Sequence, residues 1–287
     1  MSLADFWAAY GTLVAFLGIN AILALSIYMT LAAGLLSMGT AGFMSIGAYT
    51  ATLLTMQAGA PYVVAVLAGA AVAALFGLAL GLPVLRLRGV YLAIATIGFG
   101  EIVRIVALNL PFTGGALGIN GIPRLTEWWH IALALALLVY CFVRLRGSRM
   151  GAALAAIRED EIAARASGIA ARRYKTIAFV FSAAIAGLAG GLSAHLTFFI
   201  SPNEFSFALA VNVLVYAVVG GTSAFVGPIM GAVVITLLPE LLRNVGLTAG
   251  ALRLGANGLI LLLVILFLPN GLLQLFTGRR ARLASST

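Results

Sequence analysis

Long apolar stretches without charge dominate the sequence. The residues from Phe6 to Leu85 include no Asp, Glu, Lys or Arg. A helix needs about 20 apolar residues to cross the hydrocarbon core of a bilayer, so this stretch alone has room for about three spans. Strands of a membrane barrel would alternate apolar with polar residues, and no such alternation occurs here. The pattern therefore predicts membrane-spanning helices.

Charge-free windows punctuated by Gly and Pro predict nine helical segments along the chain. They cover approximately residues 8–34, 41–57, 62–84, 90–109, 128–143, 176–198, 205–219, 225–241 and 254–270. The expected fold class is an all-α integral membrane protein, a polytopic helical bundle of about 8–10 transmembrane segments with some short or broken helices. The first segment is expected to be a retained span, because Met1 to Trp7 carries no positive region typical of a signal peptide.

Composition and charge exclude several other classes of protein. Of 287 residues, 63% are hydrophobic and 9% are charged, whereas soluble domains carry roughly a quarter charged residues. The 17 basic residues outnumber the 8 acidic ones, but they sit in short segments between apolar runs, which argues against nucleic-acid binding. The single cysteine, Cys141, can form neither an internal disulfide nor a thiolate metal cage, and no other metal site is indicated.

Three basic clusters predict the orientation in the membrane. They are Arg86 with Arg88, eight basic residues between Arg144 and Lys175, and Arg279, Arg280 and Arg282. Because cytoplasmic loops are enriched in Lys and Arg, we expect all three clusters, and with them the C-terminus, in the cytoplasm. The N-terminus lies outside if the segment at 41–57 crosses fully and inside if that segment is re-entrant, and both alternatives stay open.

Two glycine-rich interruptions read Gly-Thr-x-x-Phe and are each followed by Gly-Ala. They lie at Gly39–Phe43 and at Gly221–Phe225. Transporters often place the substrate route at broken helices in corresponding parts of the chain. Candidate residues of a translocation pathway are therefore Gly39, Thr40, Gly42, Gly221 and Thr222. Close helix packing through small residues is the alternative explanation.

Glu101 and Arg104 lie three residues apart within one predicted span. Ionisable residues inside a membrane are costly and face protein or water, so Glu101 is a further candidate for the pathway. An i, i+3 pair of opposite charge can also neutralise itself, and a structural clamp is the interpretation that we favour.

The segment from Arg144 to Lys175 is the sizeable stretch outside the predicted spans. Ala152 to Ser167 contains neither Pro nor Gly and is rich in helix formers. Its residues Leu154, Ile157, Glu161 and Ala164 share one helical face, and Gly168 is placed to end the helix as its C′ residue. The mixed charges of residues 158–161 favour docking on a protein partner over binding to an anionic lipid surface.

This segment resembles a known family. Ala163-Ala164-x-x-x-Gly168 resembles the EAA loop of ABC importer permeases, although Ile162 stands where that family has its leading Glu. The run Met150–Ala164 resembles the LivM type of branched-chain amino acid permease. Further similarity to that type lies at Gly42–Thr50, Leu87–Thr96, Phe99–Arg104, Thr113–Ile119, Gly121–Pro123, Gly168–Ile169, Arg173–Lys175 and Leu268–Leu273, where Leu268 replaces the family's usual Arg.

The resemblance implies a single transmembrane permease domain, 1–287, in a bacterial inner membrane, with a cytoplasmic coupling loop at about 144–175. It implies a LivH-like second permease subunit, two ABC ATPase subunits and a periplasmic or lipid-anchored substrate-binding protein, with membrane lipid around the spans. The residues implied in coupling to the ATPase are Arg158, Glu159, Glu161, Ala163, Ala164 and Gly168. The substrate would be a branched-chain or related amino acid, with urea and short amides as alternatives.

The chain lacks the sequence features of an enzyme. A P-loop needs Gly-x-x-x-x-Gly-Lys followed by Ser or Thr, and the one lysine, Lys175, follows Tyr174. We therefore expect no cofactor on this chain, with ATP and Mg²⁺ at the partner ATPases. The alternative function is a stand-alone, ion-coupled secondary transporter of a small polar solute, which would need an intramembrane carboxylate such as Glu101.

Overall fold

The computed structural model describes residues 3–244 together with residues 258, 271 and 272. The helices are α1 (Leu3–Ala32), α2 (Thr40–Gln57), α3 (Tyr62–Val84), α4 (Val90–Asn109), α5 (Trp128–Arg146), α6 (Arg149–Glu159), α7 (Glu161–Ala166), α8 (Ala171–Thr197), α9 (Phe207–Gly220) and α10 (Val226–Asn244). Three short 3₁₀ helices, η1 (Pro111–Thr113), η2 (Gly115–Leu117) and η3 (Pro202–Phe205), and two strands, β1 (Ile119–Asn120) and β2 (Phe199–Ile200), complete the described elements.

The predicted helical bundle is confirmed. Eight of the nine predicted segments coincide with α1–α5 and α8–α10. The ninth, 254–270, lies outside the described residues apart from position 258. Leu268 and the basic residues Arg279, Arg280 and Arg282 also lie outside them. Within the described part, five helices are long and apolar enough to cross a membrane: α3, α4, α5, α8 and the Tyr10–Ala32 part of α1. The apolar helices at Phe207–Gly220 and Val226–Glu240 are shorter.

Helix α8 is the packing centre of the bundle, in contact with α1, α2 and α3. Glycines allow its closest approach to α2, because a Cβ added at Gly190 would collide with the backbone of Met44 and Ala48. Small residues at such crossings let helix backbones pack closely and gain van der Waals contact in a membrane, where burial away from water gives little driving force. The α2–α8 crossing therefore depends on the absence of a side chain at this position.

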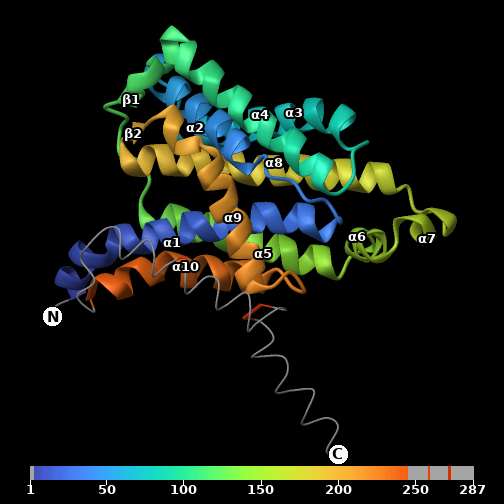
Figure 1. Cartoon of the computed structure of the whole chain (residues 1–287). Coiled ribbons are helices and arrows are strands. Elements are labelled where there is room, and N and C mark those ends of the chain that lie inside the picture. Colours follow the sequence, from blue (N-terminus) through green and yellow to red (C-terminus); the bar gives the residue numbers. More distant parts are fainter. Residues whose placement is uncertain (1–2, 245–257, 259–270, 273–287) are drawn as a thin grey trace, which may run out of the picture.

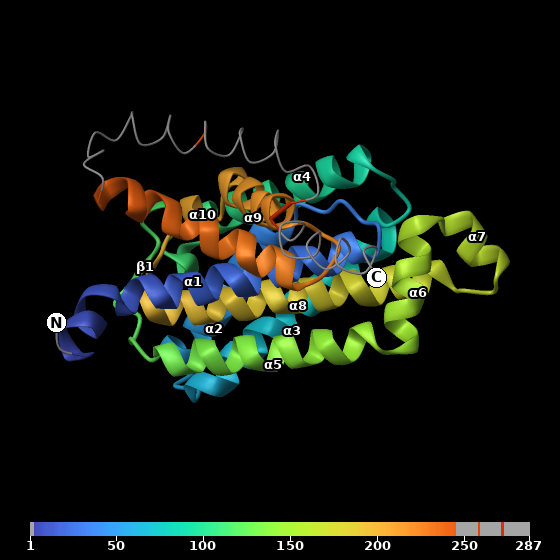
Figure 2. The ribbon, with the colours of Figure 1, turned by 90° about the horizontal axis from the view of Figure 1, so that it is seen from below.

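The two ends of the bundle differ (Figure 1). Helices α6 and α7 project from one end, whereas β1, β2 and the N-terminal end of α1 lie at the other, and the view from below shows the same separation (Figure 2). Strands β1 and β2 pair antiparallel with Ile119 opposite Ile200. This ladder joins the α4–α5 connection to the segment between α8 and α9. Strands of two residues leave no periodic pattern in a sequence, and the ladder was not predicted.

The projecting segment differs from its prediction in one respect. A single helix was expected over Ala152–Ser167, but the structure has two helices that meet at Asp160. The backbone of Asp160 is extended, and its carboxylate accepts hydrogen bonds from the amides of Ile162 at 2.7 Å and Ala163 at 3.1 Å. Aspartate stabilises a helix more as an N-cap than inside it, so Asp160 ends α6 and starts α7.

Candidate functional site

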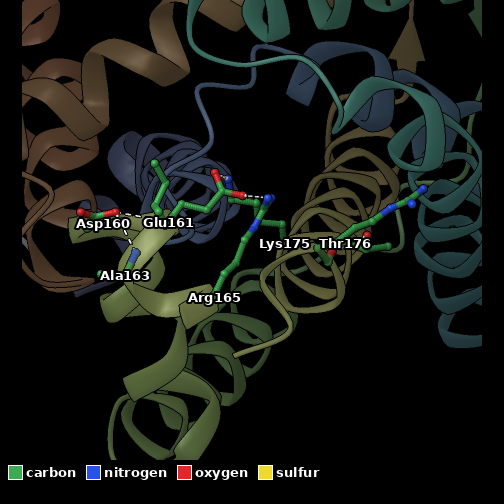
Figure 3. A network of polar contacts seen from close by, with 8 residues as sticks. Asp160, Glu161, Ala163, Arg165, Lys175 and Thr176 are labelled. Carbon is green, nitrogen blue, oxygen red and sulfur yellow. Dashed lines mark hydrogen bonds and ion pairs between the residues drawn. The ribbon is translucent and has the colours of Figure 1, made fainter. Parts of the chain in front are cut away.

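Glu161 anchors the projecting segment to the bundle (Figure 3). Its carboxylate accepts a hydrogen bond from Lys175 at 2.8 Å and forms an ion pair with Arg165 one turn further along α7. Burial alone would raise the pKa of the Glu161 carboxyl, but the hydrogen bonds and positive charges of Lys175 and Arg165 outweigh burial and hold this pKa below its ordinary value. The site therefore keeps a charged carboxylate between α7 and α8.

The two alanines of the EAA-like motif have different surroundings. Ala164 is 4% exposed and packs with Ile157 and Ala171 in a small apolar cluster under α7. Ala163 is exposed, and the neighbouring Ile162 is 74% exposed. Of the two alanines, only Ala163 is thus placed to meet a partner directly. Sequence reasoning did not single out Ile162 as a contact residue, although an isoleucine in place of the family's Glu was a signal.

Gly168 ends α7 as predicted. Its φ of +82° lies in the left-handed region. The amide of Ile169 bonds to the carbonyl of Ala164 and that of Gly168 to the carbonyl of Arg165, both at 3.0 Å, which is the hydrogen-bond pattern of a Schellman motif. A Cβ at this position would meet no atom within 4 Å. The requirement for glycine is therefore conformational, not steric.

Arg158 joins two residues that the sequence placed in different candidate sites. Its guanidinium donates to the Thr222 carbonyl at 2.8 Å and to the Thr222 hydroxyl at 2.9 Å. Both Arg158 and Glu159 line a cavity of about 520 Å³ between the ends of α1 and α5, helix α6 and the α9–α10 turn. The predicted coupling residue Arg158 and the predicted pathway residue Thr222 are thus in direct contact.

Two other pathway candidates, Gly39 just before α2 and Gly42 in its first turn, pack against α4. A Cβ at Gly42 would lie 3.0 Å from the Gly100 Cα, and the hydroxyl of Thr96 accepts a hydrogen bond from the Met38 amide, just before Gly39, at 2.9 Å. These contacts are those of close helix packing. Four buried hydroxyl groups on α2 have no hydrogen-bond partner within the described structure: those of Thr40, Ser45, Tyr49 and Thr52.

Glu101 bridges α4 to the start of α9. One carboxylate oxygen accepts a hydrogen bond from the Arg104 side chain at 2.7 Å, and the other accepts one from the Phe207 amide at 3.3 Å. Arg104 in turn donates to the Asn203 side chain at 3.2 Å. A cavity beside Glu101 measures about 10 Å³, which is room for about one water at most. In this conformation Glu101 makes structural contacts, and its place on a substrate route stays a prediction.

Comparison with known proteins identifies the family. Residues 10–268 match the model of the branched-chain amino acid transport system permease component family. The chain is 37% identical over 294 residues to the high-affinity branched-chain amino acid transport system permease protein LivM of Escherichia coli K12, covering 90% of this chain and 67% of that protein. The LivM protein of Salmonella typhimurium LT2 is similar to the same extent. No solved structure matches the chain. The chain therefore belongs to the family of permease components of branched-chain amino acid transport systems.

Proposed function

We propose that this chain is a permease subunit of an ATP-driven importer in a bacterial inner membrane, and that it forms part of the pathway for branched-chain or related amino acids. The observation that carries the proposal is the family match over residues 10–268. In this proposal the chain acts as a single permease domain, 1–287, that moves solute and catalyses no reaction of its own.

The proposed energy source is a pair of separate ATPase subunits that bind ATP and Mg²⁺. The docking element would be α7, because it projects from the bundle and carries the exposed apolar residues Ile162 and Ala163. Amphipathic helices dock into grooves on partners through such exposed apolar residues. A second permease of the same family and a substrate-binding protein would complete the importer.

The anchoring contacts support a mechanical role for this segment. A displacement of α7 would reach α8 through the Glu161–Lys175 ion pair and through the apolar cluster that contains Ala164 and Ala171. Helix α8 packs against α1, α2 and α3, so its movement would displace these three helices as well. The proposed orientation places the α6–α7 end and the C-terminus in the cytoplasm, following the basic residues.

The test is uptake by the reconstituted importer. The chain would be co-expressed with its partner permease and ATPases, purified, and placed in liposomes with the substrate-binding protein. Uptake of radiolabelled leucine, isoleucine and valine is expected with ATP and Mg²⁺ and not with a non-hydrolysable ATP analogue. Labelled urea and a short amide would be measured in parallel, and uptake of these in place of the amino acids would reject the proposed substrate class.

A second arm addresses the secondary-transporter alternative. Liposomes that contain the chain alone would be given a proton or sodium gradient without ATP. The proposal expects no uptake under these conditions. Gradient-driven uptake by the chain alone would contradict dependence on ATPase partners.

A further inference from the structure

Helix α6 lies between two connections of the bundle, the α1–α2 connection and the α9–α10 turn. On one side, a Cβ at Gly34, in the α1–α2 connection, would lie 3.5 Å from the Arg158 Cα. On the other side, the Arg158 side chain reaches Thr222 in the α9–α10 turn. Arg158, near the end of α6, therefore lies close to the α1–α2 connection through its backbone and bonds to the α9–α10 turn through its guanidinium.

We propose that Arg158 is the positioning residue that ties helices α6 and α7 to the α9–α10 turn (residues 221–225). A displacement of α6 and α7 would then move this turn together with α9 and α10. The inference rests on the proposed function, because it assumes that an ATPase moves the segment. It adds a second route into the bundle that is separate from the Glu161–Lys175 contact with α8.

The geometry of the contact suits the transmission of force. Two donors of one guanidinium hold the carbonyl and the hydroxyl of one residue at 2.8 and 2.9 Å. Paired hydrogen bonds from a planar charged group fix direction as well as distance, and they are stronger than bonds between neutral groups. The two residues are 64 positions apart in the chain, so this bond links elements that the local sequence does not connect.

The turn is built to move with its two helices. Gly221 has a φ of +90°, and a Cβ at Gly220 or at Gly227 would collide with the backbone of the other side of the turn. The amide of Leu272 also donates to the carbonyl of Val219, near the end of α9, at 2.8 Å. Such close backbone packing makes α9, the turn and the start of α10 one stiff unit.

Space for this movement lies beside the turn. The cavity of about 520 Å³ that Arg158 lines is also bordered by Ser223 and Phe225 of the turn and by Phe142 of α5. Phe225 stacks on Phe142 with ring centroids 6.1 Å apart, and both side chains belong to the buried apolar core. The turn is therefore bonded to α6 at Arg158 and packed against α5 at Phe225, with the cavity beside both contacts.

The movement has an onward path through α9 and α10. At the far end of α9, the Phe207 amide bonds to Glu101 of α4. From α10, the Thr236 hydroxyl accepts a hydrogen bond from Asn20 of α1 at 2.9 Å. Displacement of the turn would thus act on α4 and α1, and both of these helices contact α2.

The experiment compares variants in the reconstituted importer by the amount of substrate transported per ATP hydrolysed. Arg158→Gln and Thr222→Val each remove part of the link. Thr222→Ser keeps both the hydroxyl and the carbonyl. Arg149→Gln removes a positive charge from the exposed start of the same helix and is the matched control. Abundance in the membrane and co-purification of the ATPases are measured for every variant.

The proposal predicts uncoupling without loss of assembly. Arg158→Gln should lower the transport-to-hydrolysis ratio by about tenfold, since a hydrogen bond to a charged group is lost, while the ATPases still co-purify and hydrolyse ATP. Thr222→Val should show a smaller decrease of the same kind, and Thr222→Ser and Arg149→Gln should resemble the unmodified protein. If Arg158→Gln fails to accumulate, the Thr222→Val and Thr222→Ser pair decides.

Two results would overturn the proposal. One is an unchanged ratio in Arg158→Gln and Thr222→Val. The other is loss of ATPase co-purification in Arg158→Gln, since that would make Arg158 a docking residue. Failure of the unmodified complex to transport any amino acid would instead reject the proposed function, so the two failures are distinguishable.

Discussion

The carboxylate of Glu161 accepts a hydrogen bond from the ammonium group of Lys175 at 2.8 Å, and this contact joins α7 to the N-terminal part of α8. Both side chains are largely withdrawn from solvent, with 18% of the Glu161 side chain and 12% of the Lys175 side chain exposed. Lys175 is the one lysine of the chain. The ion pair therefore fixes the projecting segment at a defined position on the bundle.

Glu161→Gln is expected to loosen α7 while leaving the spans intact. A charge-assisted hydrogen bond would be lost, at a cost of about 1–2 kcal/mol in the local opening free energy. Hydrogen exchange of the amides at 161–169 should become faster, with unchanged exchange in α8 beyond its first turns. Glu159→Gln, at the exposed end of α6, is the control. If the amides at 161–169 exchanged equally fast in Glu159→Gln, a specific role of Glu161 would be contradicted.

The same contact predicts a dependence on pH. The pKa of Glu161 in the folded protein lies below its ordinary value of 4.5, so the stabilisation is fully present above that ordinary value and is lost as pH falls through the lower, folded-state pKa. Protection of the amides at 161–169, which is the intrinsic exchange rate at each pH divided by the observed rate, should thus be insensitive to this group from pH 7 down to about pH 5. Protection should fall in stronger acid, and Glu161→Gln should abolish that fall. An equal acid response in the variant would contradict the assignment.

Gly168→Val should displace α7 and reduce uptake. A β-branched residue disfavours the left-handed conformation that Gly168 adopts by on the order of 1–2 kcal/mol. Gly168→Asn is the matched control, because asparagine tolerates this conformation and a Cβ meets no atom within 4 Å. Uptake and ATPase co-purification should fall in the valine variant and persist in the asparagine variant. Unchanged uptake in Gly168→Val would favour a helix that lies on the lipid surface.

Glu101→Gln distinguishes a clamp from a substrate contact. It leaves Arg104 without its acidic partner and weakens the bond to the Phe207 amide. Because both side chains are partly exposed, a loss of about 1 kcal/mol of stability is expected, and the double variant Glu101→Gln/Arg104→Gln should recover part of it. Thermal unfolding in detergent measures this, together with the KM for uptake. A raised KM with unchanged thermal stability would indicate a substrate contact.

The α2–α8 crossing should not tolerate an added methyl group. Gly190→Ala would place a Cβ against the backbone of Met44 and Ala48, whereas a Cβ at Gly98 meets no atom within 4 Å. Forcing the two helices apart is expected to cost about 1–3 kcal/mol or more. Membrane abundance and thermal stability should fall for Gly190→Ala and hold for Gly98→Ala. Equal behaviour of the two variants would argue against this crossing.

Orientation can be tested by labelling single cysteines after replacement of Cys141. Ala166, exposed on α7, and Leu117, 82% exposed near the opposite end, are suitable positions. In intact spheroplasts, an impermeant reagent should label Ala166→Cys only after the membrane is permeabilised and should label Leu117→Cys directly. The reverse pattern would invert the proposed topology.

The sequence by itself determined the apolar helices and the turn at Gly168. Helices α1–α5 and α8–α10 could be predicted because long apolar runs with little charge can be read along the chain, and five of the described helices are long and apolar enough to cross a bilayer. The end of α7 could be predicted because Gly168 acts through its own backbone conformation. Each of these features depends on neighbouring residues alone.

Only the tertiary structure decided which distant residues meet. Arg158 contacts Thr222, Lys175 contacts Glu161, and the Phe207 amide bonds to Glu101. The sequence could name several of these residues as candidates but placed Arg158 and Thr222 in separate sites. The reason is physical: in a chain of apolar helices, hydrophobic patterning specifies that a helix lies in the membrane. Which helices touch, and which polar groups pair, is set by the fit of small residues at crossings such as Gly190.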